Sequence, residues 1–250
     1  METFSRSFQT LWVIFKNEFT SYFASPIIYL VGAIWLLIAG AFFSLSLVGF
    51  NTGQGAPSMA GMLQPMVFLM IFIAPALTMR LLSEERRSGT QELLLTSPVR
   101  DWEVIVAKWL GAWAVFSVFI IITFVYPILL ITRGTPDVPL MITGYLGLWL
   151  MSGACLAIGT LASSLTQFQA VAFMMSMGGL LFLWLSTFIT RLFTGVLVAD
   201  VLNELALDSH FRSMVQRAVI DPIDIAYFFG MIAVSLFLAT QVLSSRRWQA

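Results

Sequence analysis

Reactive and charged side chains are scarce in this sequence. Its 250 residues include one cysteine, Cys155, and one histidine, His210, and only 10% are charged, against roughly 25% in a soluble globular domain. A single cysteine excludes a disulfide framework, and these two residues alone cannot make a structural zinc site. The 13 basic residues balance the 13 acidic residues, so the charge gives no reason to expect a nucleic-acid partner.

Catalytic motifs are missing as well. A phosphate-binding loop places a lysine directly after a glycine, and neither Lys16 nor Lys108 follows one. We therefore expect no catalytic residue, no metal site and no cofactor bound by this chain. The pair Glu84-Glu85 resembles the glutamate motif of intramembrane CAAX-type proteases, but those enzymes also need a later arginine and several histidines inside the membrane. The single histidine disfavours an intramembrane enzyme.

Long apolar runs dominate the sequence, which is 59% hydrophobic with a mean hydropathy of +0.90. Membrane barrels show short alternating stretches, whereas unbroken runs predict an all-α integral membrane protein, here a single domain over 1–250. Pro65 and Pro75 predict a kink or break in the second run. Six runs reach the length of about 20 residues that a bilayer requires: 27–49, 62–79, 104–131, 140–163, 169–190 and 225–244.

The first 25 residues predict an amphipathic helix in the headgroup region. They contain no separate short apolar segment and no cleavage site of a signal peptide. Ser25 and Pro26 suit the cap and the first position of the following span. Apolar residues recur at helical spacing with charged residues between them: Phe4, Phe8, Leu11, Trp12, Phe15 and Phe19.

The basic residues predict the orientation of the chain. With the N-terminus inside, nine basic residues fall in cytoplasmic segments and four in outer segments. This asymmetry places both termini in the cytoplasm. Apart from Lys108 near one end, the apolar runs carry no charge, which disfavours a proton-coupled carrier, and no charged ring indicates a channel filter. Without a targeting segment, we expect the plasma (inner) membrane of a bacterium.

The loop between the second and third spans predicts a short, stiff helix. Ser88 and Gln91 have the spacing of a capping box, and Thr90 is a second candidate cap. Three leucines at 93–95 follow, Pro98 prevents continuation, and Asp101 is expected to cap the next helix. Two interpretations are open: arginines that anchor the span to lipid headgroups, or a helix that docks into a groove of a soluble partner.

The same loop resembles the ABC type-2 permeases, nearest the gliding-motility-type branch. The resemblance rests on 74–80 and 84–98, and it extends to 101–108, to 210–228 and to the ending at 246–248. One departure is Ala218, which stands where the pattern leads us to expect glycine. Pro222 and Ile223 also replace a more polar pair.

The resemblance implies six spans, an N-terminal elbow helix, a cytoplasmic coupling helix and a helical outer loop before the last span. A separately encoded ABC ATPase would bind ATP and magnesium, and two permease copies, as a homodimer, would join two ATPases. A membrane-anchored auxiliary subunit with an outer domain would complete the gliding-type complex in its membrane lipids. The expected ATPase-coupling residues are Glu84, Glu85, Arg86, Arg87, Ser88, Gly89, Thr90, Gln91, Glu92, Leu93, Leu94, Leu95, Thr96, Ser97 and Pro98.

The loop 191–224 is the expected outer gate, as a helical pair implied by the resemblance. Three acidic residues repeat every four positions and would share one helical face. A solvated acidic face without a role and a cation site with His210 are the alternatives. The gate candidates are Asp200, Glu204, Asp208, His210, Phe211, Met214 and Asp221.

Two further patterns leave their location open. A stripe at fourfold spacing in the fourth span would lie inside the protomer or at a dimer seam: Gly147, Met151, Cys155, Gly159 and Ser163. Four phenylalanines would line an apolar path, face lipid or pack in the core: Phe68, Phe72, Phe182 and Phe188. The function expected from all these features is the permease subunit of an ABC exporter. The alternative is an ATP-driven mechanical transmitter that acts on an outer partner without moving a substrate.

Overall fold

The computed structural model describes residues 2–51, 59–90, 99–133, 137–190 and 204–247. Within these ranges the chain forms helices and turns and contains no strand, which confirms the all-α class. The helices are α1 (Glu2–Ala24), α2 (Pro26–Asn51), α3 (Ala60–Thr78), α4 (Ser83–Arg87), α6 (Asp101–Thr123), α7 (Val125–Arg133), α8 (Val138–Leu165), α9 (Gln169–Thr190), α11 (Leu207–Arg217) and α12 (Pro222–Arg247).

Six helical stretches are long and apolar enough to cross a membrane. They agree in order with the six predicted spans and extend most of them by a few residues. The third stretch consists of two helices, α6 and α7. The stretches are Pro26–Val48, Ala60–Arg87, Asp101–Thr132, Val138–Leu165, Gln169–Ile189 and Pro222–Ser245.

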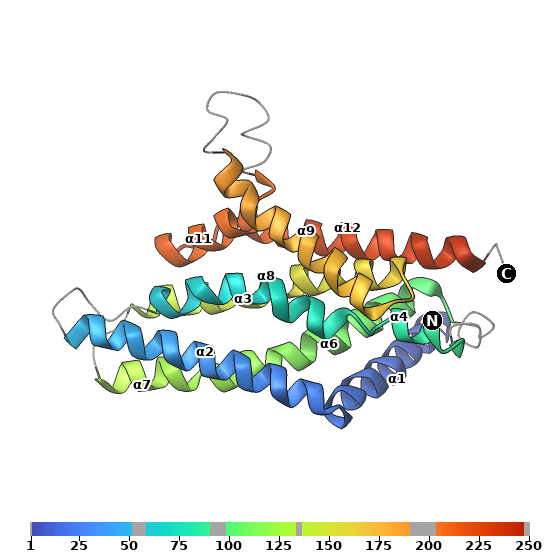
Figure 1. The fold of residues 1–250 in the computed structure, drawn as a ribbon, viewed down its shortest axis with the longest axis horizontal. Coiled ribbons are helices and arrows are strands. Elements are labelled where there is room, and N and C mark those ends of the chain that lie inside the picture. The colour runs from blue at the N-terminus through green and yellow to red at the C-terminus, as the bar shows by residue number, and fades with distance from the viewer. Residues whose placement is uncertain (1, 52–58, 91–98, 134–136, 191–203, 248–250) are drawn as a thin grey trace.

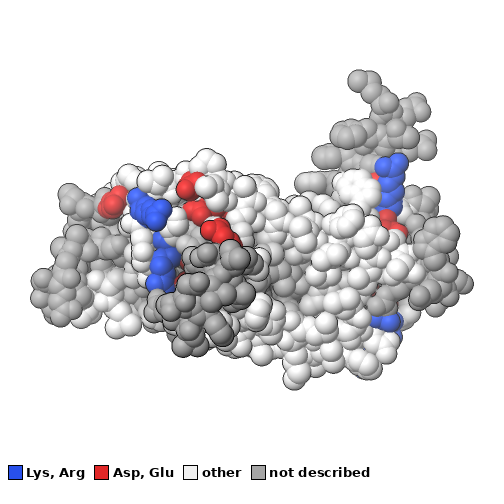
Figure 2. Space-filling model, turned by 90° about the horizontal axis from the view of Figure 1, so that it is seen from above, with Lys and Arg blue, Asp and Glu red and all other residues white. Residues whose placement is uncertain are grey.

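Figure 1 shows the long helices lying beside one another along the horizontal axis of the molecule. The start of α1 and the end of α12 lie at the same end of the bundle as α4, and α11 lies toward the opposite end. The central helix is α8, which contacts α3, α6, α9, α11 and α12, while α1 lies along α6. On the face shown in Figure 2, charged side chains gather toward the two ends, and a broad uncharged band separates them. Such a band is what a bilayer-spanning protein presents to lipid.

The small residues of α8 lie inside the protomer, which decides between the two predicted locations of the stripe. A Cβ at Gly159 would collide with Thr78 Oγ1 of α3. A Cβ at Gly147 would lie 3.1 Å from Met214 Sδ of α11. Met151 and Cys155 are 2% and 1% exposed. The glycines therefore let α3 and α11 approach the α8 backbone closely, as small residues do between membrane helices.

Helix α3 continues through both of its prolines, so of the predicted kink or break in the second span, a break at either proline is wrong. Pro65 and Pro75 both lie inside Ala60–Thr78. The helix ends only at Thr78, where the Met79 N–H donates to the Pro75 carbonyl oxygen at 2.8 Å. Neighbouring helices supply the packing that tolerates prolines inside membrane helices.

The break instead lies in the third span, at Phe124 between α6 and α7. Pro127 has no N–H to donate to the carbonyl of Thr123, and its ring would clash with that carbonyl in a continuous helix. The structure places Pro127 in the first turn of α7, where a missing N–H costs nothing. The hydroxyl of Tyr145 on α8 donates to the freed Thr123 oxygen at 2.9 Å. The carbonyl that Pro127 leaves without an amide donor is thus hydrogen-bonded.

A second difference concerns the start of α6. Arg100, not Asp101, occupies the N-cap position, and the Arg100 N–H donates to Glu103 Oε2 at 3.4 Å. Asp101 and Glu103 lie in the first turn, where the helix dipole favours negative charge.

Replacing Tyr145 by Phe removes the donor that satisfies Thr123 and is expected to cost about 1–3 kcal/mol of stability, the penalty for a buried unpaired carbonyl. The melting temperature of the purified protein in detergent measures this loss. In a Pro127→Ala background the restored amide N–H can bond Thr123, so Tyr145→Phe should cost clearly less. Equal costs in both backgrounds would contradict the assignment.

Candidate functional site

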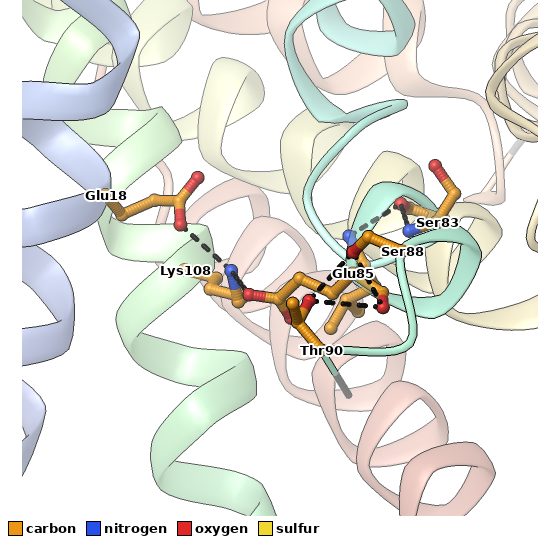
Figure 3. Close-up of polar contacts among 8 residues, drawn as sticks. Glu18, Ser83, Glu85, Ser88, Thr90 and Lys108 are labelled. Carbon is orange, nitrogen blue, oxygen red and sulfur yellow. Dashed lines mark hydrogen bonds and ion pairs between the residues drawn. The ribbon is translucent and has the colours of Figure 1, made fainter. Parts of the chain in front are cut away.

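A buried ion cluster joins three segments at the α4 end of the bundle (Figure 3). The Lys108 ammonium of α6 donates to Glu18 Oε2 of α1 at 2.9 Å and lies 2.8 Å from Glu85 Oε1 of α4. The lysine side chain is 5% exposed, and the two glutamate side chains are 19% and 27% exposed. We call these three residues the Lys108 junction.

Burial of a charge without partners is costly, so the junction requires all its members. The free-energy cost of removing the Lys108 ammonium from water is offset only because two carboxylates contact it directly. Both glutamates keep partial contact with solvent, which leaves their remaining lone pairs hydrated. Sequence reasoning noted Lys108 only as a charge near one span end and missed its partners. A signal was present, because Glu18 falls on the stripe of Phe15, Phe19 and Tyr22 that faces the bundle.

Helix α4 is also attached to the end of α8. The N–H groups of Leu82 and Ser83 donate to Ser163 Oγ at 3.1 and 3.2 Å. Ser163 Oγ donates in turn to the Met79 carbonyl at 3.2 Å, and the Ser83 hydroxyl donates to the same carbonyl. These bonds satisfy backbone groups that the end of α3 would otherwise leave unpaired. Arg86 Nη1 adds a bond to the Leu165 carbonyl at 3.3 Å.

The elbow helix α1 has a second attachment, to the end of α3. The Tyr22 hydroxyl donates to the Leu77 carbonyl at 2.7 Å. Desolvation by burial raises the pKa of Tyr22 well above its ordinary value, with the charge of Glu18 adding to the effect. The phenol therefore stays protonated and keeps donating at any physiological pH.

The described part of the expected coupling segment ends in a tight turn. Gly89 has φ +74°, a left-handed conformation that favours glycine after a helix. The hydroxyls of Ser88 and Thr90 lie 2.9 Å from each other, and each lies 3.3 Å from the Glu85 carbonyl oxygen. They thus close the end of α4, while Glu84 and Arg87 are exposed. The other predicted coupling residues lie outside the described residues: Gln91, Glu92, Leu93, Leu94, Leu95, Thr96, Ser97 and Pro98.

At the opposite end, α11 packs its apolar face on α8. Phe211 and Met214 are fully buried and contact the site of Gly147. Asp208 accepts a bond from Arg212 Nη2 at 2.7 Å, and Asp221 Oδ1 accepts from the Ile223 N–H at 2.9 Å at the start of α12.

His210 joins α11 to α12. Its Nδ1 lies 2.7 Å from Asp224 Oδ1, and its Nε2 lies 3.0 Å from the carbonyl oxygen of Glu204. Because a carbonyl can only accept, Nε2 carries a proton. Ser213 Oγ donates to the other Asp224 oxygen at 2.9 Å, and the Tyr227 ring stacks on the imidazole at 3.9 Å. Asp224, which lies 14 positions after His210, is not among the predicted gate residues.

The predicted shared acidic face is wrong for its two described members. Glu204 is exposed, whereas Asp208 is buried. Ala206 between them is extended, with φ −75° and ψ 116°, so α11 begins only at Leu207. The third member, Asp200, lies outside the described residues. Within the described ranges no group of three His, Cys, Asp or Glu side chains is placed to hold a metal ion.

The four phenylalanines lie at the protein surface. Phe68 and Phe72 of α3 are 44% and 42% exposed, and Phe182 and Phe188 of α9 are 54% and 44% exposed. The ring centroids of Phe68 and Trp184 lie 5.2 Å apart. Core packing is therefore excluded for this aromatic face, which α3 and α9 share.

Replacing Lys108 by Met leaves two adjacent carboxylates without their cation, and we expect a loss of about 3 kcal/mol, the low end for a broken buried pair. Thermal unfolding in detergent measures it. Arg87→Met is the matched control, because Arg87 is exposed and takes part in none of the described ion pairs, and it should cost below about 1 kcal/mol. Adding Glu18→Gln and Glu85→Gln to Lys108→Met should recover stability. Equal losses for the two single variants would refute the role of the junction.

Ala218 ends α11 with φ 52° and ψ 31°, which explains why glycine was expected there. The left-handed conformation costs a residue with a Cβ about 1 kcal/mol. Ala218→Gly should therefore raise the melting temperature. Ala226→Gly, inside α12 and exposed, should lower it by a similar free energy. A melting temperature lowered by both variants would count against the observed backbone conformation.

Comparison with known families agrees with the fold of a membrane protein. The family model described as ABC-2 family transporter protein matches residues 12–191, from α1 through α9. No curated protein matches the chain. The nearer resemblance to the gliding-motility-type branch stays a prediction. Because the match covers more than half of the chain, the protein belongs to the ABC-2 family of transporter proteins and is a membrane permease subunit of an ABC transporter.

Proposed function

We propose that this permease couples ATP hydrolysis by a separate ATPase subunit to export of a substrate across a bacterial plasma membrane. Membership of the family implies an ABC ATPase partner in general. The partner would bind ATP and magnesium and contact the segment 84–98. Two permease copies and two ATPases would form the complex.

The Lys108 junction is the observation that carries this proposal. A segment that a soluble partner displaces transmits this displacement to the membrane helices only if its base, where it joins them, is firmly attached. The base of this segment is α4, which Lys108 links to α1 and α6. Ser163 links the same base to α8. A displacement of 91–98 would thus reach α1, α6 and α8 together.

The positions of the chain ends support the proposed orientation. The start of α1, the end of α12 and α4 lie at one end of the bundle (Figure 1). Arg80, Arg86, Arg87 and Arg100 belong to the same end, as the positive-inside rule requires of a cytoplasmic face. The ATPase would approach from this side, and α11 would face the exterior.

Purification of the tagged full chain from its native membrane, with subunit composition and ATPase activity recorded, tests the proposal. An ATPase that co-purifies in a two-to-two complex supports it. An additional protein with an outer domain, together with no cavity between the two permease copies, would instead favour mechanical transmission. A chain that is purified alone in mild detergent would contradict coupling.

Replacing Leu94 by Asp should detach the ATPase or uncouple it, because a charge would enter the apolar contact that the leucines are predicted to make. We expect at least a tenfold loss of co-purified ATPase with unchanged amounts of permease in the membrane. Leu94→Met keeps the apolar contact and is the control. Normal co-purification and normal activity with Leu94→Asp would place the ATPase contact elsewhere.

A further inference from the structure

An apolar groove of about 830 Å³ lies between α1 and α6. This volume is within the range of small-molecule sites. Phe15 of α1 forms one wall, Trp113 and Ala114 of α6 form the other, and Trp149 of α8 contributes to the lining. The groove therefore runs along the junction of the elbow helix and the third span.

The polar atoms of the groove wall bond one another. Trp113 Nε1 donates to the Trp149 carbonyl at 3.1 Å, and Trp149 Nε1 donates to Ser117 Oγ at 3.0 Å. Ser117 Oγ donates to the Trp113 carbonyl at 2.7 Å. These paired groups leave the wall with carbon surface for an occupant, which suits a hydrocarbon chain better than water.

One cation lines this surface. Lys16 is exposed and is the charged residue among the described residues that line the groove. The described ion pairs involve Lys108, His210 and Arg212 but not Lys16. An apolar groove lined by one exposed cation complements a molecule that has a hydrocarbon tail and a negative head.

The dimensions of the groove match one leaflet. Leu110 to Val118 on α6 covers about 12 Å at the helical rise, close to half of the roughly 30 Å hydrocarbon core. A second groove of about 540 Å³ starts at the shared residues Ser117 and Trp149 and continues toward Val138. Its described lining contains no charged residue. The α1–α6 groove thus extends about as far along α6 as one leaflet is deep, and in contrast to the second groove its lining includes a cation.

We propose that the α1–α6 groove binds an anionic phospholipid from the leaflet at the α1 end of the molecule. One acyl chain lies against Trp113 and Ala114, and the phosphate contacts Lys16. The bound lipid fills the space between the elbow helix and the third span. This inference does not depend on the export proposal, because it concerns the lipid-facing side of α1 and α6.

Native mass spectrometry of the full chain with equal amounts of phosphatidylglycerol and phosphatidylcholine tests the site. We expect one retained lipid, with phosphatidylglycerol preferred. Lys16→Gln should lower this preference by roughly fivefold, the factor for one lysine near a membrane surface. Arg100→Gln removes an exposed cation that does not line the groove and should leave the preference unchanged.

Filling the groove gives an independent test. Ala114→Trp should abolish retention of the lipid, whereas Ala233→Trp, at an exposed position of α12, should not. Val118→Trp serves as a second filling variant if Ala114→Trp lowers the yield of folded protein. Equal retention of both lipids in the wild type, retention unaffected by filling, or a cross-link from Phe15 to a second copy of the chain would each overturn the proposal.

Discussion

The contact of one buried ammonium with two carboxylates holds the α4 end of this protein together. Lys108 is the point where the elbow helix, the short helix α4 and the third span meet. In a chain with 10% charged residues, a charge placed in the low-dielectric interior is costly unless it is paired. The same cost makes the pairing selective, because few other groups could satisfy Lys108. The positions of α1 and α4 relative to α6 follow from this requirement.

Helix α8 extends this constraint to the other end of the molecule. Ser163 near one end binds the backbone before α4, and Gly147 near the other end receives Met214 of α11. These positions are separated by about 24 Å along the helix. Between them, Gly159 excludes any side chain that would separate α8 from α3. One closely packed helix therefore contacts both candidate functional regions. A shift of α8 would displace α4 and α11 together.

The spans could be predicted from the sequence because bilayer thickness imposes a length on every apolar run. The elbow helix was equally accessible through its helical spacing. The stripe that faces the bundle places Glu18 inward but does not identify Lys108 as its partner, because the two residues lie 90 positions apart and such pairings depend on packing. The break at Phe124 was readable from Pro127, whereas the unbroken course of α3 through its prolines depends on neighbouring helices. The shared acidic face failed because the chain breaks at Ala206, a residue that carries no signal for a turn.

The order of residues in the Lys108 junction bears on how the protein is made. Glu18 and Glu85 both precede Lys108 in the sequence, and chains are synthesised and begin to fold from the N-terminus. Both acceptors have therefore left the ribosome before the lysine does. The third span can enter the bilayer with its cation near the carboxylates that will neutralise it. A circular rearrangement that placed α6 ahead of α1 and α4 would keep every contact of the finished structure, yet it would expose an unpaired lysine during insertion.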